Sequence, residues 1–147
     1  REKRFEDFNT KYKEELGLYR ANQHNKIFKY SETKSEYKEI LKEFLGFLHK
    51  NSVKPIIVIF PTSKYYLKNI KLEYRQFFDN LLNEIKKESN IKVIDLRDSS
   101  FGFDDTDFID ADHLNEEGSI NATNYLKKFI KDIWFNLQHW GRINEYK

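Results

Sequence analysis

The sequence predicts an α/β protein, because two short apolar runs alternate with stretches of helical periodicity over its 147 residues. The runs are Ile56–Phe60 and Ile91–Leu96, and the first is apolar at every position, as in a parallel strand covered on both faces. The helical stretch between them makes the two strands parallel, with a right-handed crossover. We therefore expect a three-layer, doubly wound (flavodoxin-like) parallel sheet. Since two strands are few for this class, either the residues before position 50 hold further strands or the chain is only the C-terminal part of that sheet.

Four amphipathic stretches predict the helices around these strands. The first helix is expected over about residues 5–19, followed by a loop over 20–32. Thr33–Glu36 has the form of a capping box and predicts a second helix that ends near Asn51. Two more helices are expected over about residues 71–88 and from about Asn115 to Trp140. The apolar stripes that predict them are Phe5, Phe8, Tyr12, Leu16 and Tyr19; Tyr37, Ile40, Leu41, Phe44, Leu45 and Leu48; Tyr74, Phe77, Phe78, Leu81, Leu82 and Ile85; and Ile120, Phe129, Ile130, Ile133, Trp134 and Leu137.

Composition and charge indicate one folded domain. Aromatic residues make up 16% of the chain, which argues against disorder. We expect residues 1–147 to form a single α/β domain, with an N-terminal helix over 1–20 and a core over 21–140, as the C-terminal portion of a longer protein.

The 26 basic and 24 acidic residues are interspersed and give no basic footprint for nucleic acid. The absence of cysteine excludes disulfides and thiolate catalysis. The longest apolar run is far shorter than the roughly 20 residues that cross a bilayer, so a membrane anchor is expected only in the full-length protein.

The segment from Asp110 to Gly118 contains the residues best suited to catalysis. The spacing Asp110-x-x-His113, in a loop that leads into a helix, lets the carboxylate hold one ring nitrogen while the other faces a substrate. This is the acid–base half of a serine-hydrolase relay. Asn115 is a good N-cap, and the field of the helix that follows favours neutral imidazole, whereas Asp110 favours imidazolium. These opposed effects can set the base near neutrality, although the same spacing also occurs as a loop hydrogen bond without chemistry.

The same residues resemble a known family. Asp110, His113, Leu114, Asn115 and Gly118, after a strand, look like the C-terminal block of SGNH (GDSL-like) hydrolases and acyltransferases, and are most similar to the DltD-like branch, which acts in D-alanine transfer to teichoic acids. The resemblance covers roughly residues 22–130. It implies that Asp110 and His113 are the acid and base of a catalytic triad. The family's nucleophilic serine and its oxyanion Gly and Asn blocks have no clear counterpart here, with Asn22 or Asn25 as the candidates for an oxyanion position.

This resemblance implies a function at the cell envelope. We expect ester hydrolysis or O-acyl transfer on a cell-envelope polymer, with the serine upstream of these residues and the isolated chain inactive. The expected partners are a cell-wall polymer and an acyl donor or carrier protein, at the extracytoplasmic face of a bacterial membrane. The alternative is a non-catalytic binding or scaffold module of the same fold. A phosphate- or nucleotide-binding domain is a weaker hypothesis, because no Gly-rich loop follows either strand.

Several other side chains are candidates for substrate binding. Ser63 lies at a strand end, but Pro61-Thr-Ser-Lys lacks the small residues of a nucleophile turn, so a capping hydroxyl is the favoured interpretation. Lys64 and Tyr65 could line a polymer site. The substrate-binding candidates are Asn25, Ser63, Lys64, Tyr65 and Asn115. The aspartates of the loop over residues 104–112 offer ligands for a hard cation, but their spacing does not match a calcium loop, so we expect neither metal nor cofactor.

Overall fold

The computed structural model describes the backbone of residues 3–27, 29–89 and 91–144, and the side chains of these residues up to residue 131. In chain order the elements are η1 (Phe5–Asp7), α1 (Thr10–Ile27), α2 (Ser31–Lys50), β1 (Ile56–Ile59), α3 (Lys64–Leu67), α4 (Leu72–Ser89), β2 (Lys92–Asp95), η2 (Ser99–Phe101), η3 (Asp105–Asp107) and α5 (Glu116–Asn144). The 3-10 helices η1–η3 are single turns.

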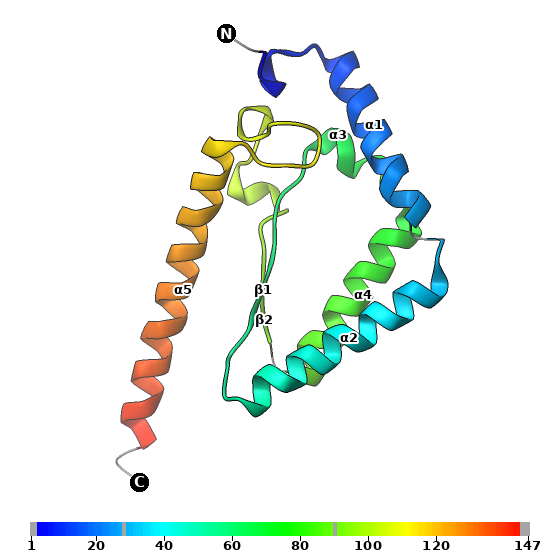
Figure 1. Cartoon of the computed structure of the whole chain (residues 1–147). Helices are drawn as coiled ribbons and strands as arrows, with labels where there is room; N and C mark the ends of the chain where they lie inside the picture. Colours follow the sequence, from blue (N-terminus) through cyan, green and yellow to red (C-terminus); the bar gives the residue numbers. More distant parts are fainter. Residues whose placement is uncertain (1–2, 28, 90, 145–147) are drawn as a thin grey trace.

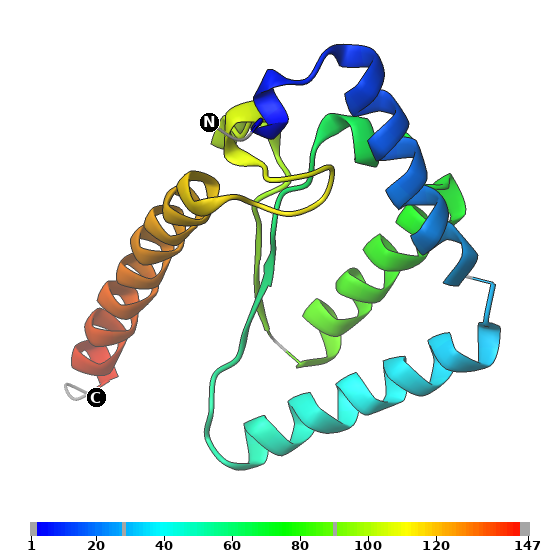
Figure 2. The same ribbon diagram turned by 45° about the horizontal axis from the view of Figure 1, so that its top comes forward.

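The two strands form a parallel sheet joined by the α4 crossover. Their register pairs Ile56 with Lys92 and Ile59 with Asp95, and the Leu96 amide extends the ladder by donating to the Ile59 carbonyl at 2.9 Å. Helix α5 lies on one side of the strands, and α2 and α4 lie on the other (Figures 1 and 2). A mixed α/β architecture with a parallel pair is therefore confirmed, while two strands alone do not establish a doubly wound sheet.

Alternate strand residues build a small core on each face of the sheet. Ile57 packs with Leu45, Ile85 and Ile91 on the side of α2 and α4. On the other side, the core against α5 contains Ile56, Val58, Ile94, Leu96 and Ala122. Full burial of a side chain such as Leu45, Ile85 or Leu96 contributes about 1.5–3 kcal/mol, which explains how so short a sheet orders the helices around it.

Much of the predicted apolar surface of α2 and α5 is exposed. On α2, Ile40 is 50% exposed and Phe44 is 55% exposed, so their predicted place in an inward stripe is wrong, as it is for Tyr37. On α5, Ile120 is 54% exposed and Ile130 is 41% exposed, again against the prediction. The narrow sheet explains this, because only part of each stripe meets a strand. The side chains of Ile133, Trp134, Leu137 and Trp140 lie outside the described residues.

Helix α1 is longer than predicted, and its buried face is not the predicted one. It runs to Ile27, so the loop expected from residue 20 is wrong up to that point. The expected stripe fails at Tyr12 and Tyr19, which are 42% and 61% exposed. The buried residues recur every four positions instead, but they are polar or small, and hydropathy therefore gives no signal for them. They are Lys13, Gly17, Ala21 and Asn25.

Two helix starts also differ from the prediction. Helix α2 begins at Ser31 with Tyr30 as its N-cap, so the predicted capping box at Thr33–Glu36 lies inside the helix and is wrong. The predicted loop after β1 contains the short helix α3, whose first turn is capped by the hydroxyl of Ser63. Helix α1 crosses α3 at Gly17, where an added Cβ would lie 2.3 Å from the Tyr65 carbonyl oxygen.

Candidate acid–base site

The Asp110–His113 segment lies in a loop closed on itself at the carboxyl end of β2. Phe108 and Leu114 form an isolated antiparallel bridge, and the Ile109 amide donates to the His113 carbonyl at 3.0 Å. Phe108 is buried in the core beneath the loop, where it packs with Phe5 and Tyr65. The two ends of the loop are therefore fixed, and the core around Phe108 sets the position of the loop tip.

Asn115 and Gly118 attach this loop to the first turn of α5. The side-chain oxygen of Asn115 accepts from the Gly118 amide at 2.9 Å, which caps the helix, and its amide nitrogen donates to the Thr106 carbonyl at 2.6 Å. A Cβ on Gly118 would lie 2.2 Å from the carbonyl oxygen of Asp107. The Leu-Asn-x-x-Gly pattern thus has a structural reason: a cap and a close approach of two backbones.

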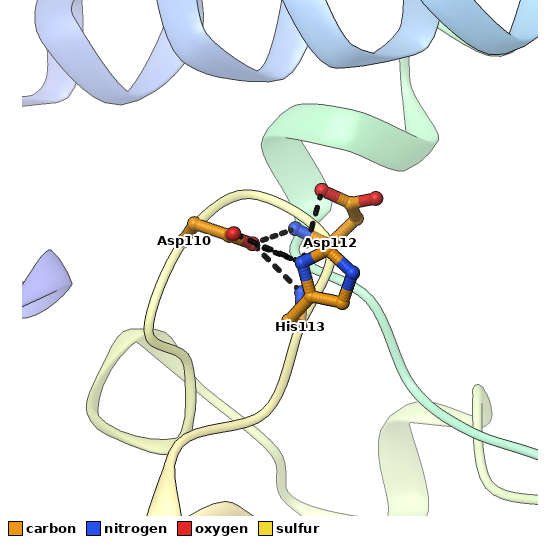
Figure 3. A group of neighbouring side chains, drawn as sticks. All are labelled: Asp110, Asp112 and His113. Atoms are coloured by element: carbon orange, nitrogen blue, oxygen red, sulfur yellow. Dashed lines mark hydrogen bonds and ion pairs between the residues drawn. The ribbon is translucent and has the colours of Figure 1, made fainter.

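Asp110 holds the imidazole of His113 by one ring nitrogen. His113 Nδ1 lies 2.9 Å from Asp110 Oδ2 and 3.1 Å from Oδ1 (Figure 3). Asp110 Oδ1 also accepts the backbone N–H groups of Asp112 and His113, each at 2.9 Å. The carboxylate is therefore fixed by three donors of its own loop. The second ring nitrogen points away from Asp110, and the side chain is 59% exposed.

The two groups shift each other's pKa in opposite directions. The hydrogen bond to Asp110 is the largest cause and raises the pKa of His113 above its ordinary value; desolvation opposes it, and the charges of Asp110 and Asp112 add to it. Burial acts to raise the pKa of Asp110, but the hydrogen bonds from the Asp112 amide and from His113 outweigh it, and the pKa falls. The carboxylate therefore favours imidazolium more strongly than the opposed effects inferred from the sequence suggested.

Asp112 places a second carboxylate beside the ring and is itself held by Arg20 of α1. Arg20 Nε lies 2.7 Å from Asp112 Oδ1, and the Arg20 Nη2 atom lies 2.8 Å from Oδ2. Asp112 Oδ1 lies 3.7 Å from His113 Nδ1, and the Asp112 side chain is only 7% exposed. Sequence reasoning missed Arg20, because its partner is 92 residues away and α1 was expected to end before it.

The same cluster is the one group of possible metal ligands found among the described residues. The cluster consists of Asp110, Asp112 and His113. Each offers one ligand atom, and these atoms lie within 4.8 Å of one another. Both carboxylates already have cationic or donor partners, however, since Arg20 takes both oxygens of Asp112. A cation would have to displace the guanidinium, so the donor set favours an ion-paired loop.

Ser63 and Asn25 lie in buried structural contacts. Ser63 is 3% exposed; its hydroxyl donates to the Ala111 carbonyl at 2.6 Å, and its backbone amide donates to the same oxygen at 3.1 Å. Asn25 is 7% exposed; it donates to the Asn69 carbonyl at 3.0 Å and accepts from the Lys71 amide at 3.1 Å. Both side chains therefore connect elements, and Ser63 joins the turn after β1 to the loop of His113.

Lys64 and Tyr65 lie near a separate cavity. Lys64 is exposed and lines a cavity of about 370 Å³ together with Thr62, Asp104 and Asp105. Tyr65 is buried, and its hydroxyl donates to Asp105 Oδ2 at 3.1 Å. Neither His113 nor Asp110 is among the residues that line this cavity. The structure thus brings Asp110, Asp112, His113 and Arg20 together, and places the substrate-binding candidates around them in other contacts.

Comparison with known protein families gives a match over most of the chain. The model of the family described as DltD protein matches residues 4–131 of this chain. Searches among curated proteins and among solved structures gave no match. The match confirms the similarity to the DltD family that the Asp-x-x-His-Leu-Asn-x-x-Gly motif suggested. Within the described residues, no helix is both long and apolar enough to cross a bilayer.

Proposed function

The chain belongs to the DltD protein family, and we propose that it supplies the acid and base of an SGNH-type ester hydrolase or O-acyltransferase. The family is involved in the D-alanylation of teichoic acids, which gives this chain a cell-envelope context. The observation that carries the proposal is the pair formed by His113 Nδ1 and Asp110 Oδ2 at 2.9 Å, with the ring exposed at the carboxyl ends of the strands. Ligands bind at this edge in doubly wound folds.

The proposed chemistry follows from the state of the ring. With Nδ1–H donating to Asp110, the neutral ring presents the lone pair of Nε2 to a serine hydroxyl. His113 takes the hydroxyl proton as the serine oxygen attacks an ester carbonyl, and Asp110 stabilises the imidazolium that forms. The imidazolium then returns the proton to the leaving group, and an acyl-serine remains. An acceptor hydroxyl or water then gives its proton to His113 and attacks the acyl-serine carbonyl; the bond to the serine oxygen breaks, and the imidazolium returns the proton to that oxygen.

We place the nucleophile outside these residues. Ser63 is buried, and its proton is engaged with the Ala111 carbonyl. We also propose that β1 and β2 are the edge of a larger flavodoxin-like sheet, and that residues 1–147 are the C-terminal portion of that domain. The exposed Ile40, Phe44 and Ile120 support this, since apolar helix faces normally cover strands. The roles of Asn22 or Asn25 at an oxyanion site, and of Lys64, Tyr65 and Asn115 in binding substrate, remain predictions.

The proposed substrates are a cell-wall polymer as acceptor and an acyl donor or carrier protein. A site at the extracytoplasmic face of a bacterial membrane suits this chemistry, because the acceptor is outside the cell. The dyad itself does not determine the acyl group, which is set by the part of the site that binds the donor.

The proposal is tested by ester hydrolysis in a longer protein that contains these residues and the serine. His113→Ala should lower kcat for a small activated ester by about 10²–10⁴-fold, the usual contribution of a positioned general base. His49→Ala is the matched control, because His49 is exposed in the last turn of α2 and should leave the rate unchanged. Equal rates for wild type and His113→Ala would overturn the catalytic proposal and favour a non-catalytic binding module.

A further inference from the structure

We propose that Arg20 is a positioning residue for His113: by binding Asp112 at both oxygens, it leaves Asp110 as the carboxylate that orients the ring. The catalytic meaning of this inference rests on the proposed function, whereas the geometry does not. The ring of His113 lies between two acids of its own loop, and only one of them can set the direction of Nε2. Arg20, from a different element, determines which one.

The contact between Arg20 and Asp112 has the geometry of a specific pair. The two distances, 2.7 and 2.8 Å, join two guanidinium nitrogens to two carboxylate oxygens, an arrangement that fixes orientation as well as charge. Oδ1 of Asp112, the oxygen nearest His113 Nδ1 at 3.7 Å, is the same oxygen that Arg20 Nε holds. The guanidinium therefore competes directly with the imidazole for that atom.

Removal of Arg20 would leave Asp112 as a buried carboxylate without its cation. Its side chain is 7% exposed, and a nearly buried, unpaired charge is strongly unfavourable. His113 Nδ1 already lies 3.7 Å from Asp112 Oδ1, so the ring would turn from Asp110 toward Asp112. Such a turn moves Nε2, and a displacement of about 1 Å at a reacting atom can cost on the order of 10² in rate.

The other polar groups near this pair do not replace Arg20. Tyr66 of α3 faces Asp112 and Arg20, but its pKa is raised to about 12, chiefly by burial and then by the charge of Asp112, so it is a neutral phenol near pH 7. Its hydroxyl lies 2.6 Å from His24 Nδ1, and is thus already paired. The charges facing His113 are therefore Asp110 and Asp112, which raise its pKa, and Arg20, which lowers it.

The direct test is an NMR pH titration of the His113 ring in this protein. The chain has four histidines, and His113→Ala assigns the signal. Arg20→Gln should raise the pKa of His113, because an opposing cation is lost and Asp112 is freed to pair with the ring. Adding Asp112→Asn should return the pKa to the wild-type value or below it. Asp112→Asn alone should lower the pKa, which keeps the test decisive if Arg20→Gln does not fold.

Arg97 offers a matched control. It makes the same two-nitrogen contact with Asp95, at 2.9 and 2.6 Å, just after β2. Arg97→Gln should leave the His113 titration unchanged, so a shift in both arginine variants would indicate a general loss of structure. An unchanged pKa of His113 in both folded Arg20→Gln and Asp112→Asn proteins would overturn the proposal.

Kinetics then separate this inference from the proposed function. In a longer, active protein, Arg20→Gln should lower kcat by about 10- to 100-fold with little change in KM, and Arg20→Lys should recover only part of the rate, because a single ammonium cannot reproduce the fork. If His113→Ala has no effect on turnover, the proposed function fails while the titration result stands. If His113→Ala abolishes turnover and Arg20→Gln does not alter it, only the positioning inference fails.

Discussion

At the scale of single residues, the carboxylate of Asp110 has the largest effect on the protonation of the candidate base. Asp110 raises the pKa of His113, and catalysis by a general base needs the neutral ring. In an active longer protein, kcat/KM should therefore rise with pH, with a midpoint above the ordinary histidine value of about 6.5. Asp110→Asn should move that midpoint down and lower the plateau. A midpoint that is the same in both proteins would contradict the assigned role of Asp110.

The same pair predicts how stability depends on pH. Because the pKa of His113 is raised in the folded protein, its interactions stabilise the fold fully at pH values below the pKa of the unfolded histidine. This stabilisation is lost as the pH rises through the pKa of the folded protein. Because the pKa of Asp110 is lowered in the folded protein, its interactions stabilise the fold at pH values above the pKa of the unfolded aspartate. This stabilisation is lost as the pH falls through the pKa of the folded protein. The melting-temperature difference between wild type and Asp110→Asn should thus be greatest between about pH 4 and 6.5, and small in size because the ring is exposed.

A second aspartate serves as the control for that measurement. Hydrogen bonds from the side chain and backbone of Ser100 lower the pKa of Asp98, and no histidine takes part in its shift. The effect of Asp98→Asn should therefore stay constant between pH 6.5 and 8, where the effect of Asp110→Asn declines. Parallel curves for the two variants would show that the histidine does not contribute.

At the scale of elements, two glycines in helices should respond in opposite ways to the same substitution. Gly118→Ala places a methyl group against the Asp107 carbonyl and should destabilise the protein by about 1–3 kcal/mol. Gly46→Ala, at an exposed position near the C-terminal end of α2 with open space around it, should stabilise by about 0.4–1 kcal/mol. Chemical denaturation measures both. An equal effect of the two substitutions would contradict the close approach of α5 to η3.

The elements also show where sequence reasoning succeeds and where it fails. Both strands and the Asp110–His113 pair were predicted, because apolar runs and a spacing of three residues are local signals. The part of helix α1 beyond residue 19 gives no such signal, because only one residue of its buried face, Ala21, is hydrophobic. The others are Lys13, Gly17 and Asn25. Arg20 could not be found, since the pairing of side chains 92 residues apart depends on the fold.

At the scale of the whole molecule, the unequal burial of neighbouring residues on α2 predicts two kinds of response. Phe44 is 55% exposed, whereas Leu45 is 4% exposed. In this chain, Phe44→Ser should change stability by less than about 0.5 kcal/mol, and Leu45→Ala should cost about 2–5 kcal/mol. In a longer protein with the proposed larger sheet, Phe44→Ser should also become costly. No difference between the two backgrounds would argue against further strands beneath α2.

The contact of Ser63 with Ala111 has a consequence for how chain length can vary. The turn that leaves β1 and the loop that carries the imidazole share one carbonyl oxygen, which receives both donors of Ser63. An insertion in either segment would displace the ring, so the two must keep matched lengths. Residues 51–53, ahead of β1, bond instead to the last turn of α2, where the Val53 amide donates to the Leu48 carbonyl at 2.9 Å, so extra residues there would act first on the end of that helix.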